Sequence, residues 1–442
     1  MDLIEFLKTM RNKYIFLSAS LLLLFFTSGI IAQQRTYSPY SRYGIGEIQE
    51  SGFGRNFGMG NTGIALKSPY HLNDMNPASY ASMDSISFYF EGGLTGFSQT
   101  LKTPTDKNQF SDINFSYFAL GFPVAQWGFF SMGLKPTSVV GYEFFNDNSG
   151  EKPINDADYY KYNGAGSGNI ARAYAGLAVS PIENLSVGMH FGYHFGNLKH
   201  NSLVQFPNDK FAQSVGTSEK IRINDIHFDF GAQYELELGT DRSIIFGATL
   251  TPEQKMKGEI VRLAGQGTTI QEEDRMVVVA DTLAYSKDDV VSDVPLSYGL
   301  GVAFNIDHKL LMTADYSSSL YSKAKIPGES DNVTRTDRQK YAFGVEYIPN
   351  DRSADFYLSR MRYRLGTYYI QDYLVVGGNQ LEDFGISFGL GMPLKRSKTS
   401  LNVGFQWGQR GTSDNSLTKE NYAKVTLNLT LHEFWFMQRK FE

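Results

Sequence analysis

Three glycines form the first pattern in this chain that could do chemistry. Gly58-x-Gly60-x-x-Gly63 has the spacing of the loop that cradles phosphate in dinucleotide-binding folds. That loop needs a buried strand before it and a helix after it. Residues 33–84 instead are rich in Gly, Ser, Asn and Tyr and show no clean periodicity. We therefore expect no nucleotide site, and we predict no cofactor.

Histidines form the second pattern, because His190 and His194 are four residues apart. On a strand this spacing separates the two side chains by about 13 Å, so one metal ion cannot bind both. His227, on the next predicted strand, is a conceivable partner for either. Lining a water-filled lumen is the role that we favour, and we predict no metal site.

Isolated charges lie on the polar faces of the predicted strands. Such charges are costly against lipid but normal inside a water-filled barrel. The chain has no G-x-S-x-G or H-E-x-x-H motif, so we predict no catalytic residue and no enzyme. The polar-face residues are Glu91, Arg172, Asp229, Asp315, Glu346, Arg362, Arg364 and Asp372, and we take His190, His194, Arg172, Asp315, Arg362 and Arg364 as candidate lumen residues.

These side chains must be positioned by strands, because the chain alternates apolar and polar residues from about residue 85 onward. In residues 423–431, for example, Ala, Val and Leu occupy every second position. The alternating runs predict about fourteen strands. They lie near 85–100, 110–122, 127–145, 169–180, 185–206, 219–238, 243–262, 290–306, 309–323, 338–348, 360–376, 380–392, 399–410 and 419–432.

The predicted connections alternate between short turns and mostly long polar segments, the latter near 146–168, 207–218, 263–289, 324–337 and 411–418. This asymmetry is typical of a transmembrane antiparallel β-barrel in the outer membrane, with short turns and both termini on the periplasmic side. A soluble β-sandwich or β-helix is the alternative, but neither explains so many glycines on the polar faces. The predicted domains are a signal peptide (1–32), an N-terminal plug or hatch (33–84) that enters from the periplasm, and the barrel (85–442).

Composition limits the other classes. The apolar run at 14–32 follows Lys8, Arg11 and Lys13, which predicts a cleaved signal peptide, although an uncleaved anchor is an alternative. The 442 residues contain no Cys, so we expect neither disulfides nor a lipoprotein. A net charge of -5 argues against a nucleic-acid partner.

Several segments together resemble the FadL/TodX family of outer-membrane transporters for hydrophobic compounds. Residues 58–65 (GMGNTGIA) and 76–80 (NPASY) resemble its hatch. Residues 292–304 with 313–316, 341–347 and 364–369 resemble two of its hairpins. The last residues, 434–442, depart from the usual pattern because they do not end on an aromatic residue.

The resemblance implies a fourteen-stranded barrel with a hatch, and passive uptake of a fatty-acid-like ligand that leaves sideways near the third strand. Pro136 lies in the third predicted strand, where it cannot donate a ladder hydrogen bond, and is our candidate for a lateral gate. In the hatch we expect Asn76, Pro77 and Ala78 to fix a turn and Gly58, Gly60 and Gly63 to allow tight turns. Outer-membrane lipid and a hydrophobic small molecule are the expected partners.

An alternative function uses the same sequence features. A FadL-like barrel could be a structural or partner component of a secretion or surface-attachment machine, bound to another envelope protein.

Overall fold

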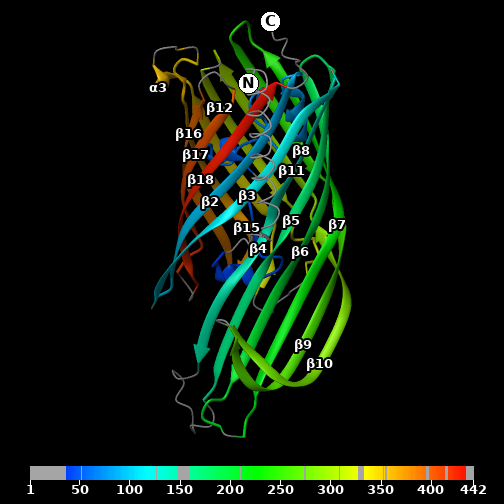
Figure 1. Cartoon of the computed structure of the whole chain (residues 1–442), viewed down its shortest axis with the longest axis vertical. Coiled ribbons are helices and arrows are strands. Elements are labelled where there is room, and N and C mark those ends of the chain that lie inside the picture. Colours follow the sequence, from blue (N-terminus) through cyan, green and yellow to red (C-terminus); the bar gives the residue numbers. More distant parts are fainter. Residues whose placement is uncertain are drawn as a thin grey trace, which may run out of the picture. The chain divides into compact units, whose positions relative to one another are not determined.

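Antiparallel strands make up nearly all of the structure. The computed structural model describes residues 36–50, 52–104, 106–125, 127–147, 159–209, 211–272, 275–307, 309–326, 333–351, 353, 356–394, 398–413 and 417–434. Within these residues fourteen strands form a wall that closes where β18 pairs with β2 (Figure 1). The wall strands are β2 (Ser87–Lys102), β3 (Lys107–Ala125), β4 (Gly128–Asp147), β5 (Lys161–Ile182), β6 (Leu185–Gln205), β7 (Ser214–Glu237), β8 (Arg242–Thr251), β11 (Ser297–Ile306), β12 (Leu310–Ser319), β14 (Arg338–Tyr347), β15 (Arg362–Val376), β16 (Asn379–Pro393), β17 (Ser400–Arg410) and β18 (Lys419–Phe434).

The predicted fold class, an antiparallel barrel of about fourteen strands, is confirmed. Three further strands and a one-turn helix accompany the wall. The hairpin of β9 (Gln254–Glu272) and β10 (Arg275–Val294) lies between β8 and β11 in sequence, β13 (Val333–Arg335) pairs with β15, and α3 (Tyr357–Arg360) precedes β15. Among the described residues, no helix is both long enough and apolar enough to span a bilayer. The predicted signal peptide (1–32) and residues 435–442 lie outside the described residues.

The burial pattern of the strands is inverted relative to that of a soluble protein. On β18, Val425 and Leu427 are 45% and 49% exposed, whereas Thr426 and Asn428 are 3% and 2% exposed. The same pattern recurs on the other wall strands, whose large apolar side chains point outward. A soluble sandwich would bury these side chains, so the alternative fold is wrong and the outer surface fits lipid.

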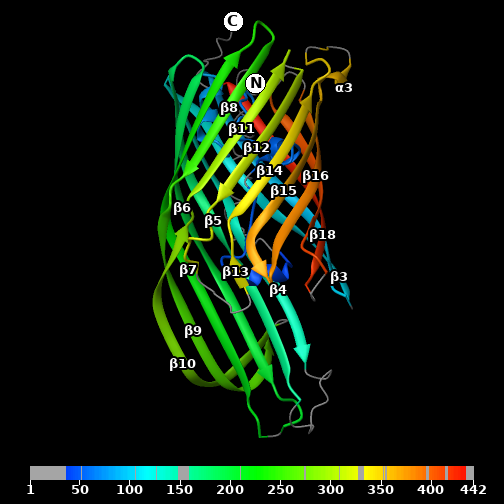
Figure 2. The same ribbon diagram turned by 180° about the vertical axis from the view of Figure 1, so that it is seen from behind.

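Strand length divides the wall into two regions. The strands β8, β11, β12 and β14 have 10 residues each, which is one bilayer crossing, whereas β7 has 24. At about 3.3 Å per residue these lengths are roughly 33 Å and 80 Å. The far ends of β4–β7, with the hairpin β9–β10, therefore project beyond the wall, at the lower end of Figures 1 and 2. We call this region, residues 138–147, 161–170, 196–205, 214–223 and 254–294, the projecting lobe.

The projecting lobe corrects two of the predicted strands. Residues 243–262 and 290–306 are not continuous strands, because Pro252 and Pro295 separate β8 from β9 and β10 from β11. The predicted loop 263–289 is instead the long hairpin β9–β10, which pairs with β7. Residues 263–289 show no regular alternation of apolar and polar residues, so no strand was predicted there. The connections at the long-loop end are also not all long, because Gly377 and Gly378 alone join β15 to β16.

An N-terminal segment, residues 36–86, lies inside the wall, with which it forms one compact unit. It contains η1 (Pro39–Arg42), β1 (Glu47–Ile48), α2 (Gly54–Phe57) and η2 (Pro77–Ser82). We call it the inner segment, because its side chains bond to strands on every side of the closed wall, from β4 and β6 to β14 and β18.

The inner segment begins near the end of the wall opposite to the one where it joins β2. Ser38 and Tyr40 bond to Glu420 and Thr418, at the start of β18, whereas the segment ends at Ser87, which pairs with Phe434 at the end of β18. The expectation that the chain enters from the short-turn end concerns residues before 36, which lie outside the described residues. The inner segment runs along the lumen from the far end to the short-turn end.

Candidate functional site

The wall is not continuous between β3 and β4. The two strands pair from Ala125 and Gly128 only as far as Phe118 and Leu134. Beyond that point, in the residues that the structure describes, Lys107–Tyr117 pair only with β2, and the rest of β4 pairs with β5 on one edge. We call this interruption the β3–β4 split.

Pro136 lies at the point where the β3–β4 split begins. It pairs with Ala171 of β5, and the register of that ladder shifts between Pro136 and Ser138. Proline has no N–H to donate and is found in sheets at edges and bulges. The side chain of the preceding Lys135 points inward and forms an ion pair with Asp74 of the inner segment. Pro136 is thus a residue without a ladder donor at the point where the wall divides.

The inner segment occupies the free edge of β4. Strand β1 pairs antiparallel with β4, with Ile48 opposite Ser138, and Gln49 N donates to Thr137 O at 2.9 Å. Further along, Gly141 N donates to Ser41 Oγ at 3.0 Å. On the other side of the split, Tyr37 stacks on Phe110 of β3 with 4.5 Å between ring centroids. The start of the inner segment therefore fills the split from inside.

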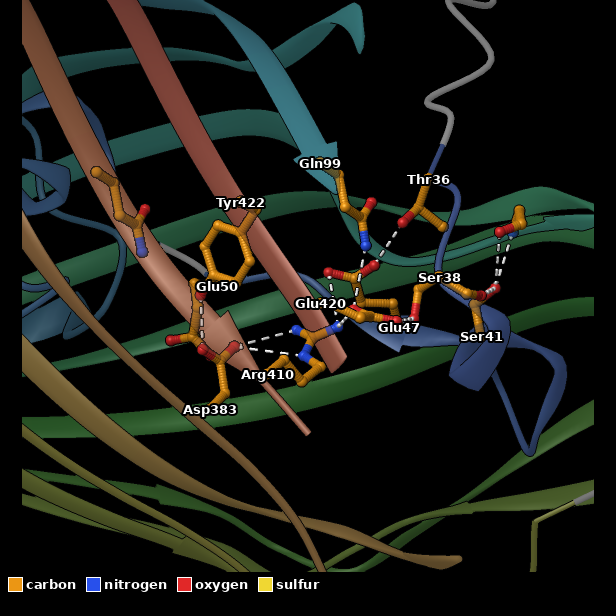
Figure 3. A network of polar contacts seen from close by, with 12 residues as sticks. Thr36, Ser38, Ser41, Glu47, Glu50, Gln99, Asp383, Arg410, Glu420 and Tyr422 are labelled. Carbon is orange, nitrogen blue, oxygen red and sulfur yellow. Dashed lines mark hydrogen bonds and ion pairs between the residues drawn. The ribbon is translucent and has the colours of Figure 1, made fainter. Parts of the chain in front are cut away.

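A buried polar network fixes this start to the wall (Figure 3). Arg410 of β17 lies 3.1 Å from Glu47, 3.3 Å from Asp383 and 3.9 Å from Glu420. Ser38 Oγ donates to Glu420 at 2.5 Å, and Thr36 Oγ1 donates to Glu47 at 2.6 Å. Burial alone would raise the pKa of Glu47, but Arg410, Lys424 and the hydrogen bond from Thr36 together lower that pKa below its ordinary value. Glu47 is thus an anion paired with Arg410 at neutral pH.

Glu50 forms a second attachment. Its carboxylate bonds to both Arg338 and Lys340 of β14. Burial opposes ionisation of Glu50, but Lys340 and Arg338 lower its pKa well below the ordinary value of 4.5. This attachment therefore persists in moderately acidic solution.

Arg55 of α2 forms the third attachment, through Glu346. The Arg55 guanidinium lies 2.7 Å from Glu346 Oε1, and Arg364 Nε donates to Glu346 Oε2 at 2.6 Å. Arg364 also donates to Asn402 Oδ1 at 2.8 Å and is 1% exposed. The sequence singled out Arg364 and Glu346 as residues of a water-filled lumen. The structure instead buries them in a contact with the inner segment.

The glycines of the pattern Gly58-x-Gly60-x-x-Gly63 let the backbone of the inner segment lie close to that of the wall. Gly60 has a φ of +70°, and a Cβ there would lie 2.6 Å from Thr367 O. Opposite it, a Cβ on Gly366 would lie 2.1 Å from Gly60 N. Gly58 similarly meets Gly389, and Gly63 N donates to Asp315 at 2.6 Å. The inward glycines of the wall therefore make room for the inner segment, which explains their abundance on the polar faces.

Asn76 caps η2 and binds the wall. Its Oδ1 accepts from Ala78 N at 3.0 Å, and its Nδ2 donates to Ile64 O at 2.7 Å and Ala232 O at 3.2 Å. Pro77 is the first residue of η2, where proline is favoured, and it packs against Gly188 of β6. The Asn-Pro-Ala stretch thus caps and begins the helix η2.

The candidate histidines lie in one buried cluster. Tyr80 of η2 bonds to His190 at 2.9 Å, and Arg172 forms an ion pair with Asp229, whose Oδ2 is 3.8 Å from His190 Nδ1. The ring of His194 stacks on that of His227 at 4.1 Å. His190 is 1% exposed, so it does not line a water-filled lumen. In the described part of the chain, no group of three or more His, Asp or Glu residues converges as metal ligands.

The two remaining candidates also contact the inner segment. Asp315 accepts from Gly63 N and from Ile64 N at 2.6 and 3.0 Å, and Arg362 lies over the ring of Tyr70 at 5.6 Å. The sequence reasoning missed the inner-segment partners Glu47, Glu50 and Asp74. These three acids lie in a Gly-rich stretch with few charges. A buried acid needs a base as its partner, and this requirement is the signal that could have linked them to bases on the polar faces of the wall.

The closed antiparallel wall and its outward apolar side chains define the fold of a transmembrane β-barrel. The structure of the toluene transporter TbuX of Ralstonia pickettii superposes with a TM-score of 0.57 at 14% identity, over 87% of this chain and 99% of that chain. TodX, the toluene transporter of P. putida, gives 0.58 at 13% identity over 88% and 100%. A FadL homologue of Pseudomonas aeruginosa gives 0.55 at 12% identity over 89% and 100%.

The BamG family model matches residues 12–442, and the chain belongs to the BamG family. No curated protein matches this sequence. The resemblance to the FadL/TodX family therefore extends to the fold, whereas the matching family carries a different name.

Proposed function

We propose that this protein is a passive outer-membrane channel for hydrophobic small molecules, in which the β3–β4 split is the lateral exit. The observation that carries the proposal is the interrupted ladder at Pro136, because a ligand leaving there enters lipid without crossing water. The structural neighbours whose printed names describe toluene transporters support the ligand class. The outward apolar side chains of the wall support the location, and export would use the signal peptide predicted at residues 1–32.

A hydrophobic cluster beside the split could receive such a ligand. Val140 of β4 packs in the projecting lobe with residues of β5, β6, β7 and β9, and Ile45 of the inner segment packs against this cluster. Movement of residues 36–49 away from β4 would connect the cluster with the split. The attachments at Glu50, Arg55 and Asn76 can meanwhile stay in place.

The inner segment acts as a plug in this proposal. Deleting residues 35–80 should leave a folded barrel that conducts small polar ions in planar bilayers, whereas the full-length chain should not conduct them. The matched control deletes the hairpin residues 254–294, which lie outside the wall. An unchanged conductance after deletion of residues 35–80 would contradict the plug.

A second candidate function is a sealed structural barrel that serves as a partner in an envelope assembly. It is favoured by the number of buried ion pairs that fix the inner segment, at Glu47, Glu50, Arg55 and Asp74. A sealed barrel should bind no hydrophobic ligand and take none up. Native mass spectrometry of the protein from its own membrane separates the two candidates, because only the channel should carry a bound hydrocarbon.

A further inference from the structure

The hairpin β9–β10 is not needed to close the wall. Strands β8 and β11 pair directly with each other over their full length, from Thr251 opposite Ser297 to Arg242 opposite Ile306. The hairpin leaves this ladder after Pro252 and returns before Pro295, and β9 pairs with the far end of β7.

Strand β10 has a free edge in the projecting lobe. One edge pairs with β9 from Arg275 to Val294. On the other edge, within the described residues, the only backbone bond to β10 is at its end, where Asp293 N donates to Lys325 O at 2.7 Å. A long strand edge in water offers unpaired N–H and C=O groups to another extended chain.

Apolar side chains are exposed beside this edge. Leu283 and Tyr285 of β10 are 52% and 62% exposed, and Leu263 of β9, which is opposite Tyr285, is 43% exposed. The ladder shifts register between Thr282 and Ala284, around Leu283. These three side chains lie beyond the level at which β8 and β11 cross the bilayer, so lipid does not account for their exposure.

The charges along β10 are mainly negative. Lys287 is 2.8 Å from Glu259 of the same hairpin, so its charge is already neutralised. Asp288 is 3.9 Å from Arg262, which also pairs with Glu219 at 2.7 Å. Asp281 and Asp289 have no ion-pair partner among the residues described. A chain that adds to this edge would therefore be favoured by basic side chains.

We infer that the free edge of β10 is a docking site for an extended, basic segment of a partner protein, which adds to the sheet as a further strand. The ladder would supply affinity through backbone hydrogen bonds. Leu263, Leu283 and Tyr285 would accept apolar side chains, and Asp281 and Asp289 would accept lysine or arginine. The inference does not depend on the transport activity of the barrel.

The test uses the full-length protein in detergent and a short fluorescein-labelled peptide in which lysine and valine alternate. Fluorescence anisotropy should show saturable binding. Affinity should fall at least about tenfold, the equivalent of 1.4 kcal/mol, for a peptide N-methylated at alternate amides, because methylation removes the ladder donors. It should fall similarly for the protein variant Asp281→Lys/Asp289→Lys.

A hairpin deletion supplies a second, independent test. Residues 254–294 are replaced by a turn that joins β8 to β11, and folding is checked by the heat-dependent gel shift of barrels. Loss of peptide binding supports the inference. If the deletion variant still binds the peptide, the binding site lies outside the hairpin and the inference is overturned. Equal affinity for the methylated peptide, or dimerisation of the protein through the hairpin in sedimentation, would also overturn it. The point variants keep the test decisive if the deletion does not fold.

Discussion

Single charged residues inside this barrel act as attachment points. Glu47, Glu50 and Asp74 of the inner segment each have a wall partner of opposite charge, and the partners lie on strands far apart in sequence, namely β17, β14 and β4. Burying a charge without a partner is costly, so removing one member of a pair is expected to destabilise the protein strongly. This loss of stability is expected whether the protein is a channel or a sealed structural barrel.

Glu346 allows the sharpest test at this scale, since it serves both Arg55 and Arg364. We expect Glu346→Gln to lower the free energy of unfolding by about 3–5 kcal/mol, because two buried guanidinium groups lose their counterion. The measurement is urea unfolding in lipid vesicles, followed by tryptophan fluorescence. Glu259→Gln, which removes the exposed pair with Lys287, is the control and should leave the unfolding midpoint within error.

Glu50 predicts a dependence on pH. Its pKa in the folded state lies below the ordinary value of 4.5, so its ion pairs contribute stability that is fully present above about pH 4.5 and lost as the pH falls through the folded pKa. We therefore expect Glu50→Gln to be less stable than wild type at pH 7, with a difference that shrinks as the pH is lowered below 4.5. Urea midpoints across this range measure it. A difference that stays constant down to the lowest accessible pH would contradict the assignment, and Glu237→Gln, at an exposed position, is the control.

At the scale of elements, the neighbours of β4 change along its length. Up to Leu134 it lies between two long strands, whereas beyond Pro136 one neighbour is the two-residue strand β1. A short strand held by few ladder bonds opens more readily than a wall strand paired on both sides.

Hydrogen exchange should report this difference. We expect the amide of Gly141, which donates to Ser41 Oγ, to exchange faster than that of Val302, in the fully paired strand β11. Mass spectrometry of peptides from the two strands in detergent measures the rates. Equal protection of both would mean that the inner segment covers the free edge of β4 as firmly as a wall strand would.

The strands of the wall could be predicted from the sequence, whereas the hairpin β9–β10 and the contacts of the inner segment could not. Alternation predicted the wall strands because an apolar outer face and a polar inner face have the same period as the strand itself. Residues 263–289 of the hairpin β9–β10 project beyond the wall and lack that alternation. The partners of Arg364, Asp315 and His190 could not be predicted either, because contacts between the inner segment and the wall join residues that are up to several hundred positions apart and follow no periodicity.

At the scale of the whole molecule, we propose that hydrophobic ligands leave through the β3–β4 split when the inner segment moves away from β4. The chain contains no Cys, so a pair of introduced cysteines forms a single defined crosslink. Ile48 and Ser138 are directly opposite each other in the pairing of β1 with β4, at a separation suited to a disulfide. Ser297 and Ser319 are opposite each other in β11 and β12, within the intact wall, and serve as the matched control pair.

The decisive measurement is uptake of a fluorescent fatty acid into vesicles that contain Ile48→Cys/Ser138→Cys, before and after addition of a reductant. The channel proposal predicts that the oxidised protein takes up little of the probe and that reduction restores uptake, whereas the Ser297→Cys/Ser319→Cys control transports equally in both states. Uptake that is unaffected by the crosslink between β1 and β4 would contradict lateral exit at the split.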